Sequence, residues 1–84
     1  MLSNQRAMGE KIPNTYLIKD LAHLTGYSTY TIKYYLKIGL IKERSRSLET
    51  RYRYFDDSTI VLLKQIRAFR KAGKSIRQIK DELL

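Results

Sequence analysis

Apolar side chains recur at helical spacing in the first half of the chain, and glycines interrupt the pattern where a helix should end. One stripe begins at Ile18 and Leu21 and stops at Gly26. Ser28 is a suitable N-cap for a second helix, and Gly39 follows that helix as a stop signal. Two helices joined by such a short glycine turn predict a helix-turn-helix.

The pattern changes in the second half of the chain. Residues 42–55 carry no helical stripe, and arginine alternates with tyrosine over residues 51–54, which favours a strand. We therefore expect a basic β-hairpin spanning residues 41–55, followed by a helix that Asp56 caps and Gly73 ends. The chain then has room for one more helix. The expected fold class is mainly α: a winged helix-turn-helix with a short β-hairpin wing and two C-terminal helices.

Both C-terminal helices are expected to pack through apolar stripes. Ser75 and Gln78 have the spacing of a capping box at the start of the last helix. We also expect a short extended stretch at Tyr16–Ile18, and a return of the chain to the core at Leu40 and Ile41. The inward-facing residues expected in the two helices are Ile60, Leu63, Ile66, Phe69, Ile76, Ile79 and Leu83.

Length and charge narrow the functional class. Eighty-four residues form one small domain, expected over residues 14–84 after a flexible arm at 1–13, with little room for a deep catalytic cleft. Lys and Arg number 17 against 8 Asp and Glu, a formal net charge of +9, for which polyanion binding is the usual reason. The absence of cysteine excludes disulfides and thiolate metal sites.

The same residues give no sign of catalysis. The carboxylates are scattered among basic groups, and His23 has no second ligand in view, so we expect no enzyme, no cofactor and no metal site. No apolar run approaches the length of a membrane span, and the start of the chain lacks the apolar stretch of a signal peptide. A reducing cytoplasm is the expected location.

The predicted second helix has two unlike faces. Ile32 and Tyr35 are expected to pack, whereas a second stripe carries two lysines and two phenols at positions i, i+3, i+4 and i+7: Tyr30, Lys33, Tyr34 and Lys37. Ammonium and phenol groups hydrogen-bond phosphates and base edges. The stripe therefore predicts a recognition helix for DNA. A solvated helix face is the alternative.

In order and spacing, these elements resemble the DNA-binding domain of MerR-family transcription regulators over residues 16–84. The residues that match the family's patterns are Tyr16-Leu17-Ile18; Ser28, Thr31, Ile32, Lys33, Tyr34, Tyr35, Gly39 and Leu40; Tyr52-Arg53-Tyr54-Phe55; and Ile66 to Ser75. The sequence departs from those patterns at Lys33, where arginine is usual, at Leu36, where an acidic residue is usual, and at Arg51, where glycine commonly precedes the second strand of the wing.

The charge pattern and the resemblance together imply a double-stranded DNA partner. The candidate DNA-binding residues are Ser28, Thr29, Tyr30, Lys33, Tyr34 and Lys37 in the second helix; Arg44, Arg46, Arg51, Tyr52 and Arg53 in the wing; and Arg70 and Lys74 at the junction of the last two helices. Arg70 could instead pair with Asp57 or Asp81.

We expect sequence-specific DNA binding in transcription control by a regulator without an effector domain, either a domain cut from a longer protein or a small complete relative. RNA polymerase or a recombinase are candidate partners at the bound site. We expect the chain to be a monomer alone and paired or arrayed on bacterial nucleoid DNA. Two alternatives stay open: an excisionase-like architectural factor that bends DNA, and a protein-interaction module whose basic face docks an acidic partner.

Overall fold

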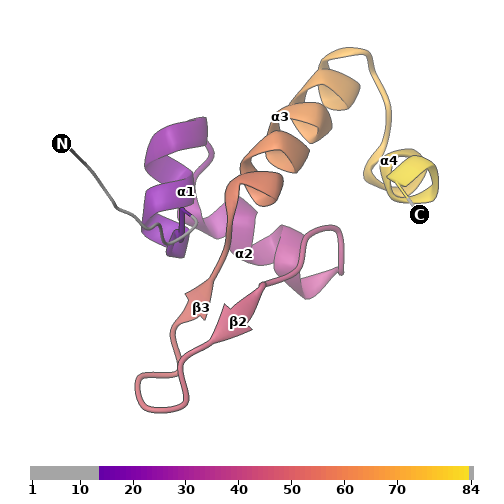
Figure 1. The fold of residues 1–84 in the computed structure, drawn as a ribbon. Helices are drawn as coiled ribbons and strands as arrows, with labels where there is room; N and C mark the ends of the chain where they lie inside the picture. Colours follow the sequence, from indigo (N-terminus) through magenta and orange to yellow (C-terminus); the bar gives the residue numbers. More distant parts are fainter. Residues whose placement is uncertain (1–13, 84) are drawn as a thin grey trace, which may run out of the picture.

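The computed structural model describes residues 14–83, and the expected arm at residues 1–13 lies outside them (Figure 1). Its elements follow the predicted order of helix, helix, hairpin, helix, helix. They are α1 (Ile18–Thr25), α2 (Thr29–Lys37), β2 (Ser45–Arg46), β3 (Arg53–Tyr54), α3 (Asp57–Lys71) and α4 (Ile76–Leu83). The winged helix-turn-helix is therefore confirmed, with the hairpin extending away from the helices in Figure 1.

The turn between α1 and α2 is fixed by local hydrogen bonds. Gly26 has a left-handed backbone (φ +80°), and its N–H donates to the carbonyl of Ala22 at 2.9 Å. Because a side chain would strain this conformation, glycine is the suitable residue here. The Ser28 hydroxyl then accepts the N–H of Thr31 at 3.1 Å, as a helix N-cap does. These bonds fix where α2 starts.

A single apolar core holds the helices and the base of the hairpin together. Its buried side chains come from every part of the described chain: Leu21, Ile32, Tyr35, Leu40, Ile41, Phe55, Leu63, Ile66 and Ile79. The predicted stripe residues Ile60, Phe69, Ile76 and Leu83 are only partly buried and pack around its edge. Since Leu40 and Ile41 are buried at the end of α2, the wing leaves the core at a defined place.

The hairpin is confirmed, but its strands are shorter than the alternation of side chains predicts. Ser45 pairs with Tyr54 and Arg46 with Arg53. Arg51 and Tyr52 lie outside β3, so the strand prediction is wrong for these two residues. The physical reason is that Arg51 has a left-handed backbone (φ +66°) and closes the turn by donating its N–H to the Ser47 carbonyl at 2.9 Å.

The base of the hairpin is tied to the start of the described chain. Tyr16 and Phe55 form an antiparallel bridge through two reciprocal N–H···O bonds of 2.8 Å. The extended stretch predicted at Tyr16–Ile18 therefore holds for Tyr16 but not for Ile18, which already begins α1. Because Phe55 is also buried in the core, the base of the wing is fixed to the rest of the domain.

The two C-terminal helices carry the predicted caps. The Asp56 carboxylate accepts the N–H of Ser58 at 3.0 Å, and Gly73 follows α3 with φ +88°. Ser75 and Gln78 exchange side-chain bonds with each other's N–H at 3.1 and 2.8 Å, which is a complete capping box. The helix α4 then returns toward the end of α2, where the Lys80 ammonium donates to the Ile38 carbonyl at 2.7 Å.

Candidate nucleic-acid interface

The helix α2 is anchored through one face and exposed on the other. Ile32 is fully buried and Tyr35 is 5% exposed, whereas Tyr30 is 80% and Tyr34 45% exposed. The other candidate residues of this helix, Ser28, Thr29, Lys33 and Lys37, are exposed as well. The structure therefore places the predicted lysine and tyrosine stripe on the solvent side of a rigidly held helix. Tyr35 lies in the core, as predicted.

A cation and an aromatic pair hold α2 against α3. The Arg67 guanidinium lies 4.3 Å from the centre of the Tyr27 ring, and Tyr27 meets Tyr35 edge-on at 5.7 Å between ring centres. The Tyr27 hydroxyl donates to the Leu63 carbonyl at 3.1 Å. Burial, helped by the neighbouring Tyr35, raises the pKa of Tyr27 above its ordinary value. Sequence reasoning missed this cluster, because nothing in the spacing links residue 27 to residue 67.

A basic groove runs between α2 and the wing. Its lining comes from the helix, the loop after it and both strands: Lys33, Leu36, Lys37, Glu43, Arg46 and Arg53. Four of the predicted DNA-binding residues thus meet in one place. The groove also contains an acidic residue, Glu43, that sequence reasoning did not single out. Its only signal in the sequence is a carboxylate within an otherwise basic segment.

The Glu43 carboxylate binds both wing arginines. Arg46 donates from Nε and Nη2 to its two oxygens at 3.0 Å each, and Nε of Arg53 lies 3.1 Å from Oε1. Chiefly because of the Arg46 hydrogen bonds, the pKa of Glu43 lies below its ordinary value and the pKa of Arg46 above its own. The carboxylate is therefore charged at neutral pH and joins two guanidinium groups.

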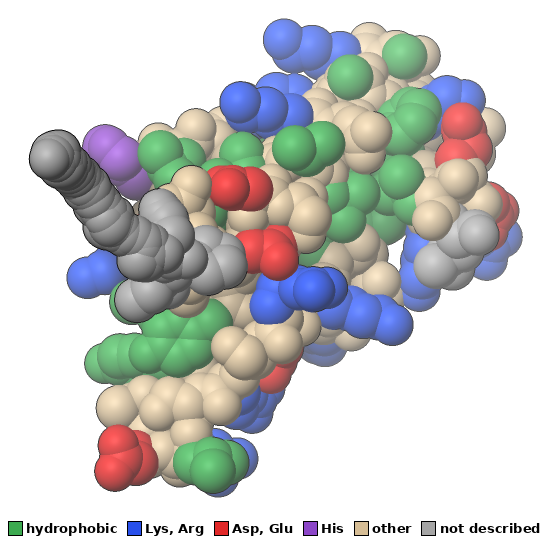
Figure 2. All heavy atoms as spheres, viewed as in Figure 1, with side chains coloured by type: hydrophobic (Ala, Val, Ile, Leu, Met, Phe, Trp, Pro, Cys, Tyr) green, Lys and Arg blue, Asp and Glu red, His purple; other side chains and the backbone are tan. Residues whose placement is uncertain are grey.

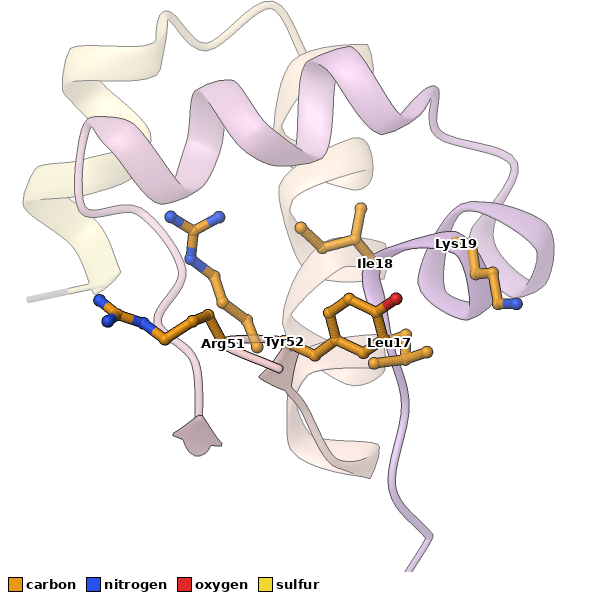
Figure 3. A pocket seen from close by; sticks show the side chains of 6 residues that line it. Leu17, Ile18, Lys19, Arg51 and Tyr52 are labelled. Atoms are coloured by element: carbon orange, nitrogen blue, oxygen red, sulfur yellow. The ribbon is translucent and has the colours of Figure 1, made fainter. Parts of the chain in front are cut away.

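The remaining wing residues point to other surfaces. Arg51 and Tyr52 line a second hollow with the start of α1, and Arg53 lines this hollow as well as the groove; the other lining residues are Leu17, Ile18 and Lys19. In Figure 3 the Tyr52 ring is directed toward Leu17, whereas the Arg51 side chain extends away from it.

Arg44 lies apart from the groove. Its Nε is 3.0 Å from the Asp56 carboxylate at the start of α3. The structure therefore does not bring all five wing candidates to one surface.

The third group of candidates lies where α3 meets α4. Arg70 donates to the Lys74 carbonyl at 3.2 Å, and the Lys74 ammonium lies 2.6 Å from the Glu82 carboxylate. Ion pairs of Arg70 with Asp57 or Asp81, which the sequence left open, are not among the contacts of residues 14–83. Arg70 instead lines a hollow with Arg67 and Lys71, two further cations beyond the predicted set.

The face of the molecule drawn in Figure 2 carries more basic than acidic side chains. Figure 2 shows Lys and Arg side chains on several parts of one face and carboxylates in small separate groups. His23 is exposed. Within residues 14–83, no group of three or more His, Cys, Asp or Glu side chains is placed to hold a metal ion. None of the described helices combines the length and the apolar character needed to cross a membrane.

A two-helix unit with an exposed basic face, a wing beside it and a supporting helix pair defines the winged helix-turn-helix class. The sequence profile of the family described as "MerR HTH family regulatory protein" matches residues 16–84, and the chain belongs to this family.

Relatives in sequence are transcription regulators. A "Probable heavy metal-dependent transcriptional regulator" from Haemophilus influenzae (strain ATCC 51907 / DSM 11121 / KW20 / Rd) is 44% identical over 62 residues, which cover 74% of this chain and 48% of that protein. "Heavy metal-dependent transcription regulator 1" from Rhizobium meliloti (strain 1021) is 40% identical over 60 residues, 71% of this chain and 40% of that protein. The chain thus spans less than half the length of these relatives.

Solved structures confirm the fold. A MerR-family transcriptional regulator from Bacillus cereus superimposes with a TM-score of 0.77 at 24% identity, covering 83% of this chain and 52% of that one. HiNmlR, described as a MerR family regulator lacking the sensor domain and bound to promoter DNA, gives a TM-score of 0.72 at 29% identity, with coverages of 81% and 51%.

Proposed function

We propose that this domain binds double-stranded DNA in a sequence-specific manner and acts in transcription control. One observation carries the proposal: α2 is fixed in the core through Ile32 and Tyr35, while its lysine and tyrosine stripe faces solvent beside a wing that carries arginines. An α-helix fits the major groove, where base edges can be distinguished. The promoter DNA bound by the similar HiNmlR supports the same use of the fold.

The two parts of the interface would make different contacts. The α2 stripe, through Tyr30, Lys33, Tyr34 and Lys37, would reach base edges and choose the site. The wing arginines and the cations near the junction of α3 and α4, Arg70 and Lys74, would meet phosphates and supply most of the affinity. We further propose that the chain acts at the nucleoid in the cytoplasm, as a monomer when free and paired or arrayed on its sites.

Substitutions in α2 and in the wing test this division of roles. Preferred duplexes would first be selected from genomic fragments with the natural sequence. Tyr34→Phe and Lys33→Ala should then weaken the preferred duplex more than random duplex, by about 1–3 kcal/mol each if the side chain contacts a base. Arg53→Ala and Arg46→Ala should weaken both duplexes about equally and reduce the log–log salt slope by about one each.

Fluorescence anisotropy titrations measure these affinities, and circular dichroism first confirms that each variant is folded. The deciding quantity is the ratio of the affinities for the preferred and the random duplex. If the wing variants lost this preference while the helix variants kept it, the roles assigned to α2 and the wing would be reversed. If the natural sequence failed to bind any duplex at low salt, the proposed function itself would be wrong.

A further inference from the structure

Glu43 is the acidic residue in the lining of the proposed DNA-binding groove, where a negative charge should oppose binding. Its side chain is 30% exposed and lies among Lys33, Lys37, Arg46 and Arg53. On charge alone, an incoming phosphate would be repelled by this carboxylate. The contacts of Glu43 nevertheless give it a different role.

The position of the two arginines explains why a carboxylate is needed. Arg46 and Arg53 are directly opposite each other in the two-stranded hairpin. Like charges at such positions repel, and long side chains without a partner sample many rotamers. Glu43 reduces both the repulsion and the rotamer freedom. Its two oxygens accept bidentate hydrogen bonds of 3.0 Å from Arg46, and Oε1 lies 3.1 Å from Nε of Arg53.

The geometry also leaves hydrogen-bond donors free for DNA. Arg46 donates from Nε and Nη2 to Glu43, and Arg53 forms an ion pair with the same carboxylate through Nε. Among the contacts of residues 14–83, Nη1 of Arg46 and both Nη groups of Arg53 therefore remain available for phosphate oxygens. The fork of a guanidinium suits this double use, since its N–H groups point in several fixed directions.

We propose that Glu43 is a positioning residue: it holds Arg46 and Arg53 in the orientation that binds the duplex backbone beside α2. The inference rests on the proposed function of DNA binding. This role predicts the opposite of what charge alone predicts for the loss of a carboxylate near DNA. Removing the Glu43 charge should weaken binding, because the ordering of two arginines must then occur on the DNA and costs more than the repulsion that is relieved.

Glu43→Gln and Glu49→Gln form a matched pair for the test. Both remove one negative charge from the wing region, but Glu49 lies in the exposed turn of the hairpin and shares no ion pair among the described residues. With a short random-sequence duplex as probe, Glu43→Gln should bind about threefold to tenfold more weakly than the natural sequence. Glu49→Gln should bind equally well or more tightly.

A double-mutant cycle shows whether Glu43 acts through the arginines. In an Arg46→Ala/Arg53→Ala background, Glu43→Gln should no longer weaken binding. A second variant, Arg46→Lys, keeps the charge but cannot bind the carboxylate in a bidentate manner, so it should weaken binding. This variant provides the test if circular dichroism shows that Glu43→Gln is poorly folded.

The outcomes separate the inference from the function on which it rests. If the natural sequence did not bind duplex DNA, the proposed function would be wrong. Duplex binding that Glu43→Gln strengthens as much as Glu49→Gln does would show that Glu43 only competes with phosphate. A loss caused by Glu43→Gln that persists without the two arginines would likewise overturn the positioning role.

Discussion

Arg51 has a backbone conformation that L-amino acids rarely adopt. Its φ of +66° is the only positive value among the non-glycine residues of the described chain. The conformation is imposed by the turn of the wing, in which the Arg51 N–H donates to the Ser47 carbonyl at 2.9 Å. A left-handed backbone costs a residue with a Cβ roughly 1–2 kcal/mol. Glycine would adopt the same conformation without this strain.

A glycine and an alanine at position 51 separate backbone strain from charge. Both variants lose the cation, but only Arg51→Gly relieves the left-handed strain. After subtracting about 0.4–1 kcal/mol for the greater freedom of glycine in the unfolded chain, Arg51→Gly should be more stable than Arg51→Ala by roughly 0.8 kcal/mol, the difference between the central values of the two effects. Urea unfolding followed by circular dichroism measures the difference. Equal stabilities would mean that the turn relaxes around alanine without strain.

Single residues that act on their own backbone were predictable from the sequence. Gly26, Ser28, Asp56 and Gly73 mark helix ends because their effects are local, and the structure confirms each of them. Glu43 was not predictable in the same way. Its partners include Arg53, ten positions along the chain, and only the register of the hairpin brings the two together.

The helix α3 shows how one carboxylate can serve an entire element. Asp56 caps the helix by accepting the hydroxyl and the N–H of Ser58, and it also pairs with Arg44 of the wing. The hydrogen bond from the Ser58 side chain is the main cause that lowers the pKa of Asp56 below its ordinary value of 3.8, and Arg44 contributes. The cap and the ion pair therefore both stabilise the charged form of the carboxylate.

This pKa shift makes the stability of the fold depend on pH. A carboxyl whose pKa is lowered by folding stabilises the protein above its unfolded-state pKa, and that contribution is lost as the pH falls from about 3.8 through the lower folded-state value. Asp56→Asn keeps a capping side chain but cannot titrate, so its unfolding free energy should fall less steeply on acidification.

Urea unfolding at a series of pH values tests the role of Asp56. Asp81→Asn, on the exposed side of α4, is the charge-matched control and should follow the natural sequence. Glu43, whose pKa is also lowered, contributes its own loss below about 4.5 in all three proteins and therefore cancels in the comparison. An identical acid dependence for Asp56→Asn and the natural sequence would contradict the argument.

At the level of elements, the periodicity of the sequence predicted correctly those elements that are determined by burial in the core. It was wrong where a turn determines the backbone. All four helices were predictable, since each has an apolar stripe that must be buried. The alternation at residues 51–54 predicted a longer strand than β3, because the closing turn takes Arg51 out of the extended conformation. The groove between α2 and the wing needed tertiary structure, which places Lys33 and Lys37 opposite Arg46 and Arg53.

The whole molecule presents cations from three separate parts of the chain. They lie on α2, on the wing, and near the junction of α3 and α4. The chain has a formal net charge of +9. The combined electrostatic attraction of these cations for DNA is therefore larger than the contribution of any single contact. A duplex lying along α2 would meet cations over an extended length of backbone. Affinity is then governed by the release of counterions from the DNA rather than by one residue.

Binding to duplex DNA should therefore depend strongly on salt. If about four to six phosphates are neutralised by each chain, a plot of the logarithm of the association constant against the logarithm of salt concentration should have a slope of roughly −4 to −5. Anisotropy titrations over a range of potassium chloride concentrations give this slope. A flat response would mean that the basic surface does not meet phosphates. A much steeper one would indicate that more than one chain binds each duplex, because every added chain contributes its own set of cations.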